Sequence, residues 1–264
     1  MNKILKINNK PLKKFGQNYL IDNNLIRKFV NEFNPQIDEK IIEIGPGRGS
    51  ITSELSNKTK FLTAIEIDDR MIASLSENFP KVNFINKDIL KINFSEILDL
   101  DLKYRVIGNI PFNLTSSIFF KLIEYRNYFL DALFIIQLDV AKRITAKPNS
   151  KEYSILSVLL NYFFDVSIKF EISPNVFYPK PKVKSSAIHL IFDKYIDETI
   201  NNDLFIQIVK ASFGNRRKTL KNSLNNSIFK SYNLSGIDID LSRRAETLTI
   251  DEYVKLTRFI QKQK

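Results

Sequence analysis

A tetrapeptide in the middle of the chain, Asn109-Ile110-Pro111-Phe112, combines residue types that could act on a flat aromatic amine. The exocyclic amine of adenine is a poor nucleophile because its lone pair is delocalised into the ring. The side-chain oxygen of Asn109 and the main-chain carbonyl of Ile110 could accept its two N–H groups and favour methylation. Pro111 would fix the backbone that aims this carbonyl, and Phe112 offers a face for stacking. The same residues also suit a turn that ends a strand, with Phe112 in the core, so the rest of the chain must decide.

A glycine-rich segment, Glu43-Ile44-Gly45-Pro46-Gly47-Arg48-Gly49, lies between a predicted strand and a predicted helix. Its glycines allow a tight turn and a close approach of a ligand, but the G-x-G-x-G spacing does not match the dinucleotide fingerprint. Glu66 ends the next predicted strand, where an acidic side chain can bind ribose hydroxyls. Asp88 follows the third strand and could accept a hydrogen bond from an adenine amine. Together these features predict a site for a nucleoside without pyrophosphate, such as S-adenosylmethionine.

Strands and helices must alternate around these segments to position them. Short apolar runs predict strands at residues 40–44, 61–66, 82–85, 104–108 and 133–138. Apolar residues at helical spacing occur between them, as at residues 118–123. Residues 165–172 alternate in polarity and residues 183–192 follow after a short loop, so these two strands must be antiparallel. The pattern predicts an α/β fold with a parallel, Rossmann-like sheet that ends in an antiparallel hairpin, as in class I S-adenosylmethionine-dependent methyltransferases.

The last part of the chain differs, because its apolar residues recur only at helical spacing. Thr249 and Glu252 have the spacing of a capping box before the last predicted helix. We therefore predict two domains: residues 1–196 form a cofactor-binding, catalytic domain, and residues 197–264 form a small all-helical domain.

The composition favours an anionic partner. The net charge is +11, from 40 basic and 29 acidic residues, and the pI is about 9.5. Such a surplus indicates nucleic acid, although a lysine- and asparagine-rich composition could also produce it. The absence of cysteine excludes disulfides and thiolate sites, no metal site is predicted, and the single histidine, His189, is expected to have no chemistry. Neither a secretory signal nor a membrane-spanning run is evident, so we expect a cytoplasmic protein, or one targeted to an organelle.

Further segments match one family in order: residues 14–20, 148–158, 177–185, 213–220 and 244–246. With the glycine loop and the tetrapeptide, they make the chain similar to the ribosomal RNA adenine dimethyltransferases over nearly its whole length. No single motif is specific, but their common order is. The segments at residues 213–220 and 244–246 favour enzymes of the small ribosomal subunit over the large-subunit resistance methylases, which share mainly the first domain.

The resemblance implies roles for particular residues. The motif at residues 14–20 would close over the methionine end of the cofactor, and Phe177 would be a second aromatic wall beside the target base. The implied catalytic residues are Asn109, Ile110, Pro111, Phe112 and Phe177. The implied cofactor contacts are Asn18, Leu20, Gly45, Gly47, Glu66, Asp88 and Asn109. The implied RNA contacts are Lys182, Arg216, Arg217, Lys218 and Lys221.

The resemblance also implies an activity: dimethylation at N6 of two adjacent adenosines in the 3′-terminal hairpin loop of small-subunit (16S) ribosomal RNA, during ribosome biogenesis. The expected partner is the small subunit, and the expected state is a monomer. Two alternatives remain open, a large-subunit RNA adenine methylase and an RNA-binding assembly factor for which methylation is dispensable. An NAD-dependent dehydrogenase is disfavoured by the glycine spacing.

Two positions depart from the family pattern. Phe112 stands where the family usually has tyrosine, which keeps the stacking face and loses a hydroxyl. Leu138 replaces a lysine after the fifth predicted strand, so a phosphate contact at that position is not expected.

Overall fold

The structure is a computed structural model that describes residues 10–12, 15–99, 101–215 and 217–263. The chain divides into two compact units: Met1–Ala141 with Ser167–Asp193, and Lys142–Val166 with Lys194–Lys264. The second unit thus takes in residues 142–166, which the predicted boundary after residue 196 had placed in the first domain. The assignment of separate functions to the two sides of that boundary stays a prediction.

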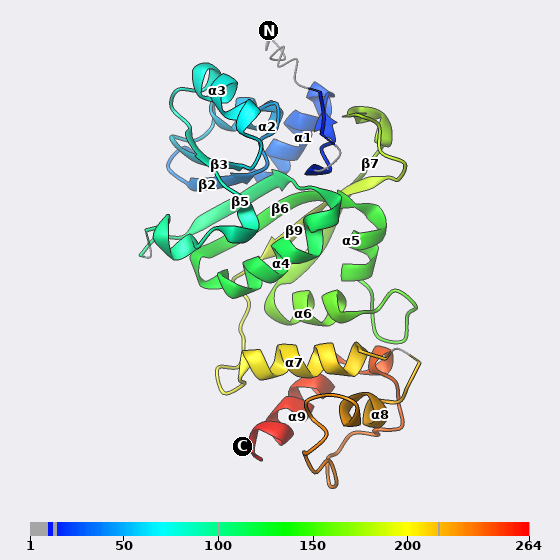
Figure 1. Cartoon of the computed structure of the whole chain (residues 1–264). Coiled ribbons are helices and arrows are strands. Elements are labelled where there is room, and N and C mark those ends of the chain that lie inside the picture. Colours follow the sequence, from blue (N-terminus) through cyan, green and yellow to red (C-terminus); the bar gives the residue numbers. More distant parts are fainter. Residues whose placement is uncertain (1–9, 13–14, 100, 216, 264) are drawn as a thin grey trace. The chain divides into compact units, whose positions relative to one another are not determined.

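The first unit is built around a seven-stranded sheet (Figure 1). In order across the sheet, its strands are β4 (Asn83–Asn86), β3 (Phe61–Glu66), β2 (Lys40–Ile44), β5 (Tyr104–Asn109), β6 (Phe129–Gln137), β9 (Ser185–Ile191) and β7 (Asp165–Ile172). The strands from β4 to β6 pair in parallel, whereas β9 runs antiparallel to β6. The predicted fold class, a mostly parallel sheet with an antiparallel end, is confirmed.

Helices and 3-10 turns lie between the parallel strands, and further helices precede β2 and follow β6. They are α1 (Asn23–Phe33), α2 (Ser50–Leu55), α3 (Asp69–Asn78), α4 (Thr115–Glu124) and α5 (Leu138–Ile144), with the 3-10 turns η2 (Ile89–Lys91), η3 (Phe94–Glu96), η4 (Phe112–Leu114), η5 (Arg126–Tyr128) and η6 (Pro174–Val176). The N-cap of α1 is Asp22, whose carboxylate accepts from the backbone N–H of Leu25 at 2.8 Å. The apolar face of α1 is buried in the core, which fixes the position of the segment that precedes it.

A second, two-stranded sheet joins distant parts of the chain. Strand β1 (Tyr19–Leu20) pairs antiparallel with β8 (Phe177–Tyr178). Leu20 and Phe177 are register partners, and both side chains are buried in the same hydrophobic cluster. The segment before α1 is therefore held against the loop that precedes β9.

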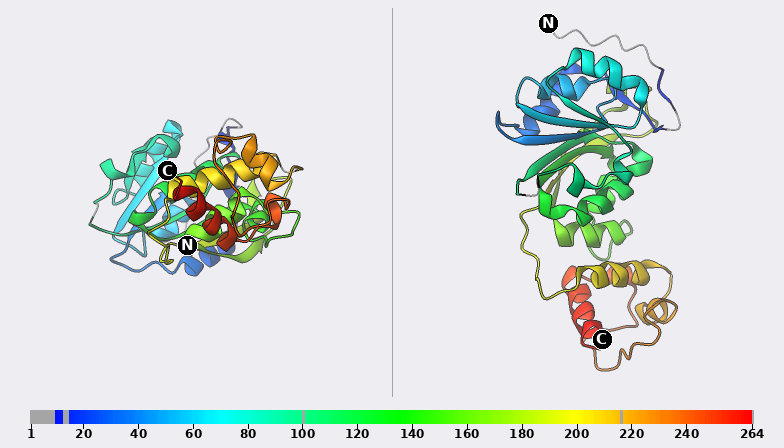
Figure 2. Two further views of the ribbon diagram at one scale, coloured as in Figure 1. Left: turned by 90° about the horizontal axis from the view of Figure 1, so that it is seen from below. Right: turned by 60° about the vertical axis from the view of Figure 1, so that its left-hand side comes forward.

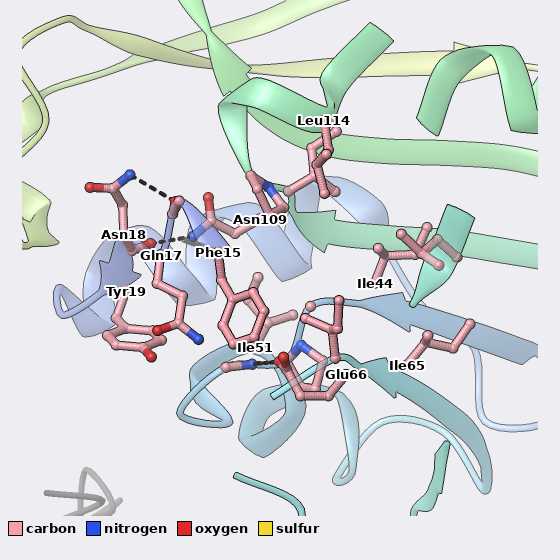
Figure 3. A pocket seen from close by; sticks show the side chains of 18 of the residues that line it. Phe15, Gln17, Asn18, Tyr19, Ile44, Ile51, Ile65, Glu66, Asn109 and Leu114 are labelled. Atoms are coloured by element: carbon pink, nitrogen blue, oxygen red, sulfur yellow. Dashed lines mark hydrogen bonds between the residues drawn. The ribbon is translucent and has the colours of Figure 1, made fainter. Parts of the chain in front are cut away.

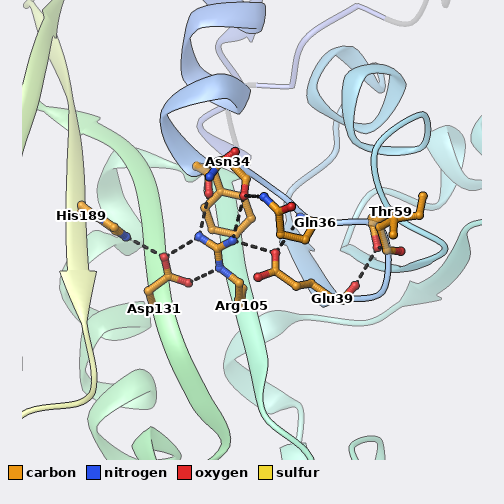
Figure 4. Close-up of polar contacts among 9 residues, drawn as sticks. Asn34, Gln36, Glu39, Thr59, Arg105, Asp131 and His189 are labelled. Atoms are coloured by element: carbon orange, nitrogen blue, oxygen red, sulfur yellow. Dashed lines mark hydrogen bonds and ion pairs between the residues drawn. The ribbon is translucent and has the colours of Figure 1, made fainter.

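A network of hydrogen bonds and ion pairs links Arg105, near the start of β5, to Asp131 on β6, to Glu39 and to the end of α1 (Figure 4). Arg105 donates from Nε and Nη2 to the two carboxylate oxygens of Asp131 at 2.7 and 2.8 Å, and from Nη1 to Glu39 at 2.7 Å. Its Nη2 also donates to the carbonyl of Phe33, at the end of α1, at 2.7 Å. Burial alone would raise the pKa of Asp131, but hydrogen bonds from Arg105 and His189 and their charges lower it. The Nε2 atom of His189 lies 2.7 Å from Oδ2 of Asp131, so His189 has a structural role as a partner of this buried carboxylate.

The second unit is helical (Figure 2). Its elements include α6 (Ile155–Phe163), α7 (Asn202–Phe213), α8 (Leu220–Asn225), η7 (Ala245–Thr247) and α9 (Ile250–Gln261). The ring of Tyr162 on α6 stacks on that of Phe205 on α7, with centroids 4.0 Å apart. The predicted capping box of Thr249 and Glu252 is present at the start of α9. Within the described residues, no helix is both long and apolar enough to cross a membrane.

Candidate functional site

A pocket opens at the carboxyl ends of β2, β3, β4 and β5 in the first unit (Figure 3). Parallel strands bring these ends to one edge of the sheet, which is where ligands bind in such folds. The pocket encloses about 880 Å³ of empty space, counting the open space at its mouth. Its lining includes Asn18, Leu20, Gly45, Gly47, Glu66, Asp88, Asn109, Ile110, Pro111 and Phe112. The structure thus brings together every predicted cofactor residue and the tetrapeptide.

The glycine loop forms one side of this pocket, and close approaches favour glycine at Gly47 in the loop and at Gly108 on the neighbouring strand β5. Gly47 has a φ of +54°, and a Cβ at this position would lie 2.9 Å from the Tyr19 ring. A Cβ on Gly108 would lie 2.4 Å from the carbonyl oxygen of Ile44, so β5 can approach β2 only without a side chain here. Gly47 therefore lets the loop backbone lie close to Tyr19, and Gly108 lets β5 lie close to β2.

Glu66 presents a buried carboxylate at the end of β3. Its side chain is 5% exposed. Its Oε2 accepts from the backbone N–H of Gly47 and its Oε1 from that of Asp68, both at 2.9 Å. Burial raises the pKa of Glu66, and these backbone hydrogen bonds oppose that change. Each oxygen keeps a further lone pair, so the carboxylate can accept hydrogen bonds from two adjacent hydroxyls.

Asp88 provides a second carboxylate, after β4. Its Oδ1 accepts from the backbone N–H of Leu90 at 2.9 Å and caps the 3-10 turn that follows. This bond fixes the rotamer of a partly exposed side chain that lines the pocket. The second oxygen of such a capping carboxylate can accept a hydrogen bond from a ligand amine.

The side-chain amide of Asn109 is oriented by the segment on the other side of the pocket. Its Nδ2 donates to the main-chain carbonyl of Asn18 at 2.7 Å, as Figure 3 shows. A carbonyl oxygen can only accept, so the NH2 group of Asn109 must face Asn18, and the Oδ1 atom remains an acceptor. Ile110 and Pro111 follow at the end of β5, and Phe112 starts a 3-10 turn, with its ring half-buried. An oriented acceptor next to an aromatic ring suits a flat base that carries an amine.

Comparison with known sequences decides the family. Residues 8–262 match the family model described as "Ribosomal RNA adenine dimethylase". The chain belongs to the ribosomal RNA adenine dimethylase family. The predicted family and the predicted enzyme class, an S-adenosylmethionine-dependent rRNA adenine dimethyltransferase, are thereby confirmed.

Curated relatives of this ribosomal RNA adenine dimethylase are similar along almost their whole length. "Ribosomal RNA small subunit methyltransferase A" of Chlorobium chlorochromatii is 40% identical over 94% of this chain and 93% of the relative. The protein of the same name from Francisella tularensis subsp. novicida is 39% identical over 95% of this chain and 98% of the relative.

Two solved structures share the fold. A dimethyladenosine transferase from Plasmodium falciparum aligns with a TM-score of 0.75 and 23% identity, over 92% of this chain and 98% of that one. The 23S rRNA methyltransferase ErmE aligns with a TM-score of 0.66 and 21% identity, over 92% of this chain and 99% of that one. At these identities the likeness shows that the fold is shared and does not extend to substrate specificity.

Phe177, the expected second aromatic wall beside the target base, has a buried side chain, and its role stays a prediction. Phe177 is 3% exposed, packs in the cluster that contains Leu20, and is not among the residues that line the pocket. Side chains alternate along a strand, so burial of Phe177 turns the next residue, Tyr178, outward, where it is 51% exposed. A base-stacking role for Phe177 would require this side chain to leave the core.

The predicted RNA contacts lie in both units of the dimethylase. Arg217, Lys218 and Lys221 are exposed in the second unit, and Lys182 is exposed in the first. Arg216 lies outside the described residues. These exposed cations are available to phosphates, and their role in RNA binding stays a prediction.

Some residues of the pocket were predicted only as members of a motif. Phe15, Gly16, Gln17 and Tyr19 line it together with Asn18. The Tyr19 ring also lies 4.6 Å from the guanidinium carbon of Arg48. The segment has too few residues for a helical or strand period to show which side chains face the pocket.

Glu43, the first residue of the glycine segment, is a buried acid at the end of β2. Its side chain is 0% exposed, and its Oε2 accepts from the Thr52 hydroxyl at 2.7 Å. Its Oε1 has no hydrogen-bond partner within the described residues. Burial raises the pKa of Glu43 to about 8, the Thr52 hydrogen bond opposes this, and the charge of Glu66 adds to it. At neutral pH the protonated, uncharged form therefore predominates.

Replacing Glu43 with Gln should change how stability depends on pH. Between the unfolded pKa of 4.5 and the folded pKa of about 8, the native state holds a proton that the unfolded chain has released. Native stability must therefore fall as pH rises through this window, by about 3 kcal/mol between pH 5 and pH 8, and a glutamine at this position removes that slope. Urea unfolding at several pH values measures this, with Glu77→Gln at an exposed position as the control. Parallel curves for Glu43→Gln and the original protein would refute the buried proton.

Proposed function

We propose that this protein transfers methyl groups from S-adenosylmethionine to the N6 amines of two adjacent adenosines in the 3′-terminal hairpin loop of small-subunit (16S) ribosomal RNA. The observation that carries the proposal is the amide of Asn109, held by the Asn18 carbonyl so that its oxygen is an acceptor. This acceptor stands beside Phe112 in a pocket whose other groups suit a nucleoside.

The pocket has the groups that S-adenosylmethionine requires. Glu66 would accept from the ribose hydroxyls, and Asp88 from the adenine amine. The backbone around Gly45 and Gly47, with Asn18 and Leu20 opposite, would hold the methionine part. The buried carboxylate of Glu66 at the pocket wall supports this fit, because two backbone N–H groups hold its oxygens in place for the ribose hydroxyls. When bound, the cofactor supplies an electrophilic methyl group.

The tetrapeptide would prepare the amine of the target base. Asn109 Oδ1 and the Ile110 carbonyl would accept its two N–H bonds, which draws the nitrogen toward a tetrahedral shape and frees its lone pair. Phe112 would stack on the ring and fix its plane. Positioning and exclusion of water would then provide the rate, with no covalent enzyme intermediate. After one methyl transfer a single N–H remains to be held, so the same acceptors serve a second transfer.

Several features support RNA of the small subunit as the substrate. The curated relatives that are about 40% identical over nearly the whole chain are named for that subunit. An adenosine in a loop leaves its stack at low cost, and exposed cations such as Arg217, Lys218 and Lys182 could hold the phosphates around it. A role in ribosome biogenesis, a monomeric state and a cytoplasmic location belong to the same proposal.

A transfer assay tests the proposal directly. The protein is incubated with radiolabelled S-adenosylmethionine and small ribosomal subunits that lack the modification, and the RNA is digested to nucleosides. We expect labelled N6,N6-dimethyladenosine from the 3′ end of the small-subunit RNA. Large subunits serve as the matched control, and label in them instead would indicate the large-subunit alternative. Binding to the small subunit without transfer would favour an assembly factor.

A further inference from the structure

Gln17 is a pocket residue whose side-chain amide is hydrogen-bonded on both sides. Its Oε1 accepts from the backbone N–H of Leu12 at 2.8 Å, and its Nε2 donates to Oδ2 of Asp68 at 2.9 Å. The first bond holds the chain earlier in the same segment, and the second reaches the end of β3. Gln17 therefore connects the N-terminal wall of the pocket, residues 15–20, to the residue that caps α3 just after the strand that carries Glu66.

The carboxylate of Asp68 is buried and held in place by Arg70, so it is a fixed acceptor for the hydrogen bond from Gln17. Asp68 is 1% exposed, and it follows Glu66 by two residues. Arg70 donates to Oδ1 from Nε at 2.8 Å and to Oδ2 from Nη2 at 2.6 Å. These hydrogen bonds from Arg70 are the main reason that the pKa of Asp68 is lowered, so the carboxylate stays charged. A charged acceptor makes the bond from Gln17 stronger than one between neutral groups.

The N-terminal wall has a second attachment on the opposite side of the pocket, where Asn109 donates to the carbonyl of Asn18. The two attachments are made at adjacent residues, Gln17 and Asn18, and Phe15 and Gly16 before them also line the pocket. One attachment thus reaches Asp68, whose backbone N–H donates to Glu66, and the other reaches the catalytic turn. Displacement of this wall would change the lining of the pocket.

We propose that Gln17 and Asp68 are positioning residues that hold the N-terminal wall closed against the cofactor pocket, and so set how tightly the cofactor and its product are retained. The inference rests on the proposed function, since it concerns the cofactor of that reaction. Gln17 acts through the wall and Asp68 acts through Gln17, with Arg70 keeping the carboxylate in place.

The substitution Gln17→Glu tests the hydrogen bond between Gln17 and Asp68, because it keeps the shape of the side chain and places a second carboxylate next to that of Asp68. Repulsion should open the wall and weaken S-adenosylhomocysteine binding, measured by calorimetry, by about tenfold. In the ligand-free protein, hydrogen exchange at the Leu12 amide should also become faster, because its acceptor moves away. Adding Asp68→Asn restores a carboxylate–amide pair with the roles reversed, although the new NH2 group cannot accept from Arg70 as the carboxylate oxygen did, so the double variant should recover part of the lost affinity and protection.

Gln207→Glu, which adds the same charge at an exposed position of α7, is the control and should match the original protein. If the original protein fails to bind S-adenosylhomocysteine, the proposed function fails. If it binds and Gln17→Glu binds equally well with unchanged Leu12 exchange, the positioning role is refuted. If adding Asp68→Asn restores none of the affinity lost in Gln17→Glu, the loss reflects a general structural defect, and the proposed pairing is refuted.

Discussion

Asn109→Ala is expected to reduce single-turnover methyl transfer to small-subunit RNA by about a thousandfold. The substitution removes the one side-chain oxygen that the Asn18 carbonyl orients as an acceptor. Without it, one N–H of the target amine loses its acceptor and the lone pair stays delocalised into the ring. The bond to Asn18 is lost as well, so binding of S-adenosylhomocysteine should also weaken, but by a much smaller factor than the rate.

Asn109→Asp sharpens this test. The shape is kept, but a carboxylate cannot donate to the Asn18 carbonyl, and two acceptors would then face each other. We expect a loss close to that of the alanine variant, although an oxygen is still present. Asn127→Ala, at an exposed position outside the pocket, should leave the rate unchanged. Full turnover by Asn109→Ala would refute the catalytic assignment.

Arg105→Ala is expected to lower the free energy of unfolding by roughly 3–5 kcal/mol, because it leaves a buried carboxylate uncompensated. Asp131 is 7% exposed and would keep only His189 as a partner in this network. The carbonyl of Phe33 and the carboxylate of Glu39 would each lose a hydrogen bond from Arg105 too. Urea unfolding followed by circular dichroism measures the change.

Lys60→Ala is the matched control, since Lys60 pairs with Asp38 at 2.9 Å where both side chains are exposed. Such a surface pair contributes at most about 1 kcal/mol. A loss for Arg105→Ala no greater than for Lys60→Ala would show that the network adds little to stability.

Short, mostly apolar runs predicted two strands of the sheet with their correct bounds. The predicted strands at residues 40–44 and 61–66 coincide with β2 and β3. Strand β6, in contrast, begins at Phe129 and not at residue 133, because Asp131 interrupts its apolar run. The charge of Asp131 is compensated by Arg105 on β5, a partner that only the folded chain brings near. Strands β1 and β8 have two residues each, too few for an alternating pattern.

The predicted site followed from one rule, that the carboxyl ends of parallel strands meet at one edge. This rule placed Glu66, Asp88 and Asn109 around one pocket, where the structure has them. It could not predict the bond between Gln17 and Asp68, which depends on how a segment outside the seven-stranded sheet crosses the pocket. Nor could it predict the burial of Phe177, which depends on which face of a two-residue strand meets the core.

The pairing of β1 with β8 makes completion of the pocket a late event in synthesis of the chain. A ribosome releases the N-terminus first, so Tyr19 and Leu20 emerge long before their partners, Phe177 and Tyr178. A nascent chain that ends before β8 already contains the glycine loop and Asn109, yet it lacks the strand that fixes one pocket wall. The newly made protein therefore becomes competent to retain a small molecule only after β8 has been translated.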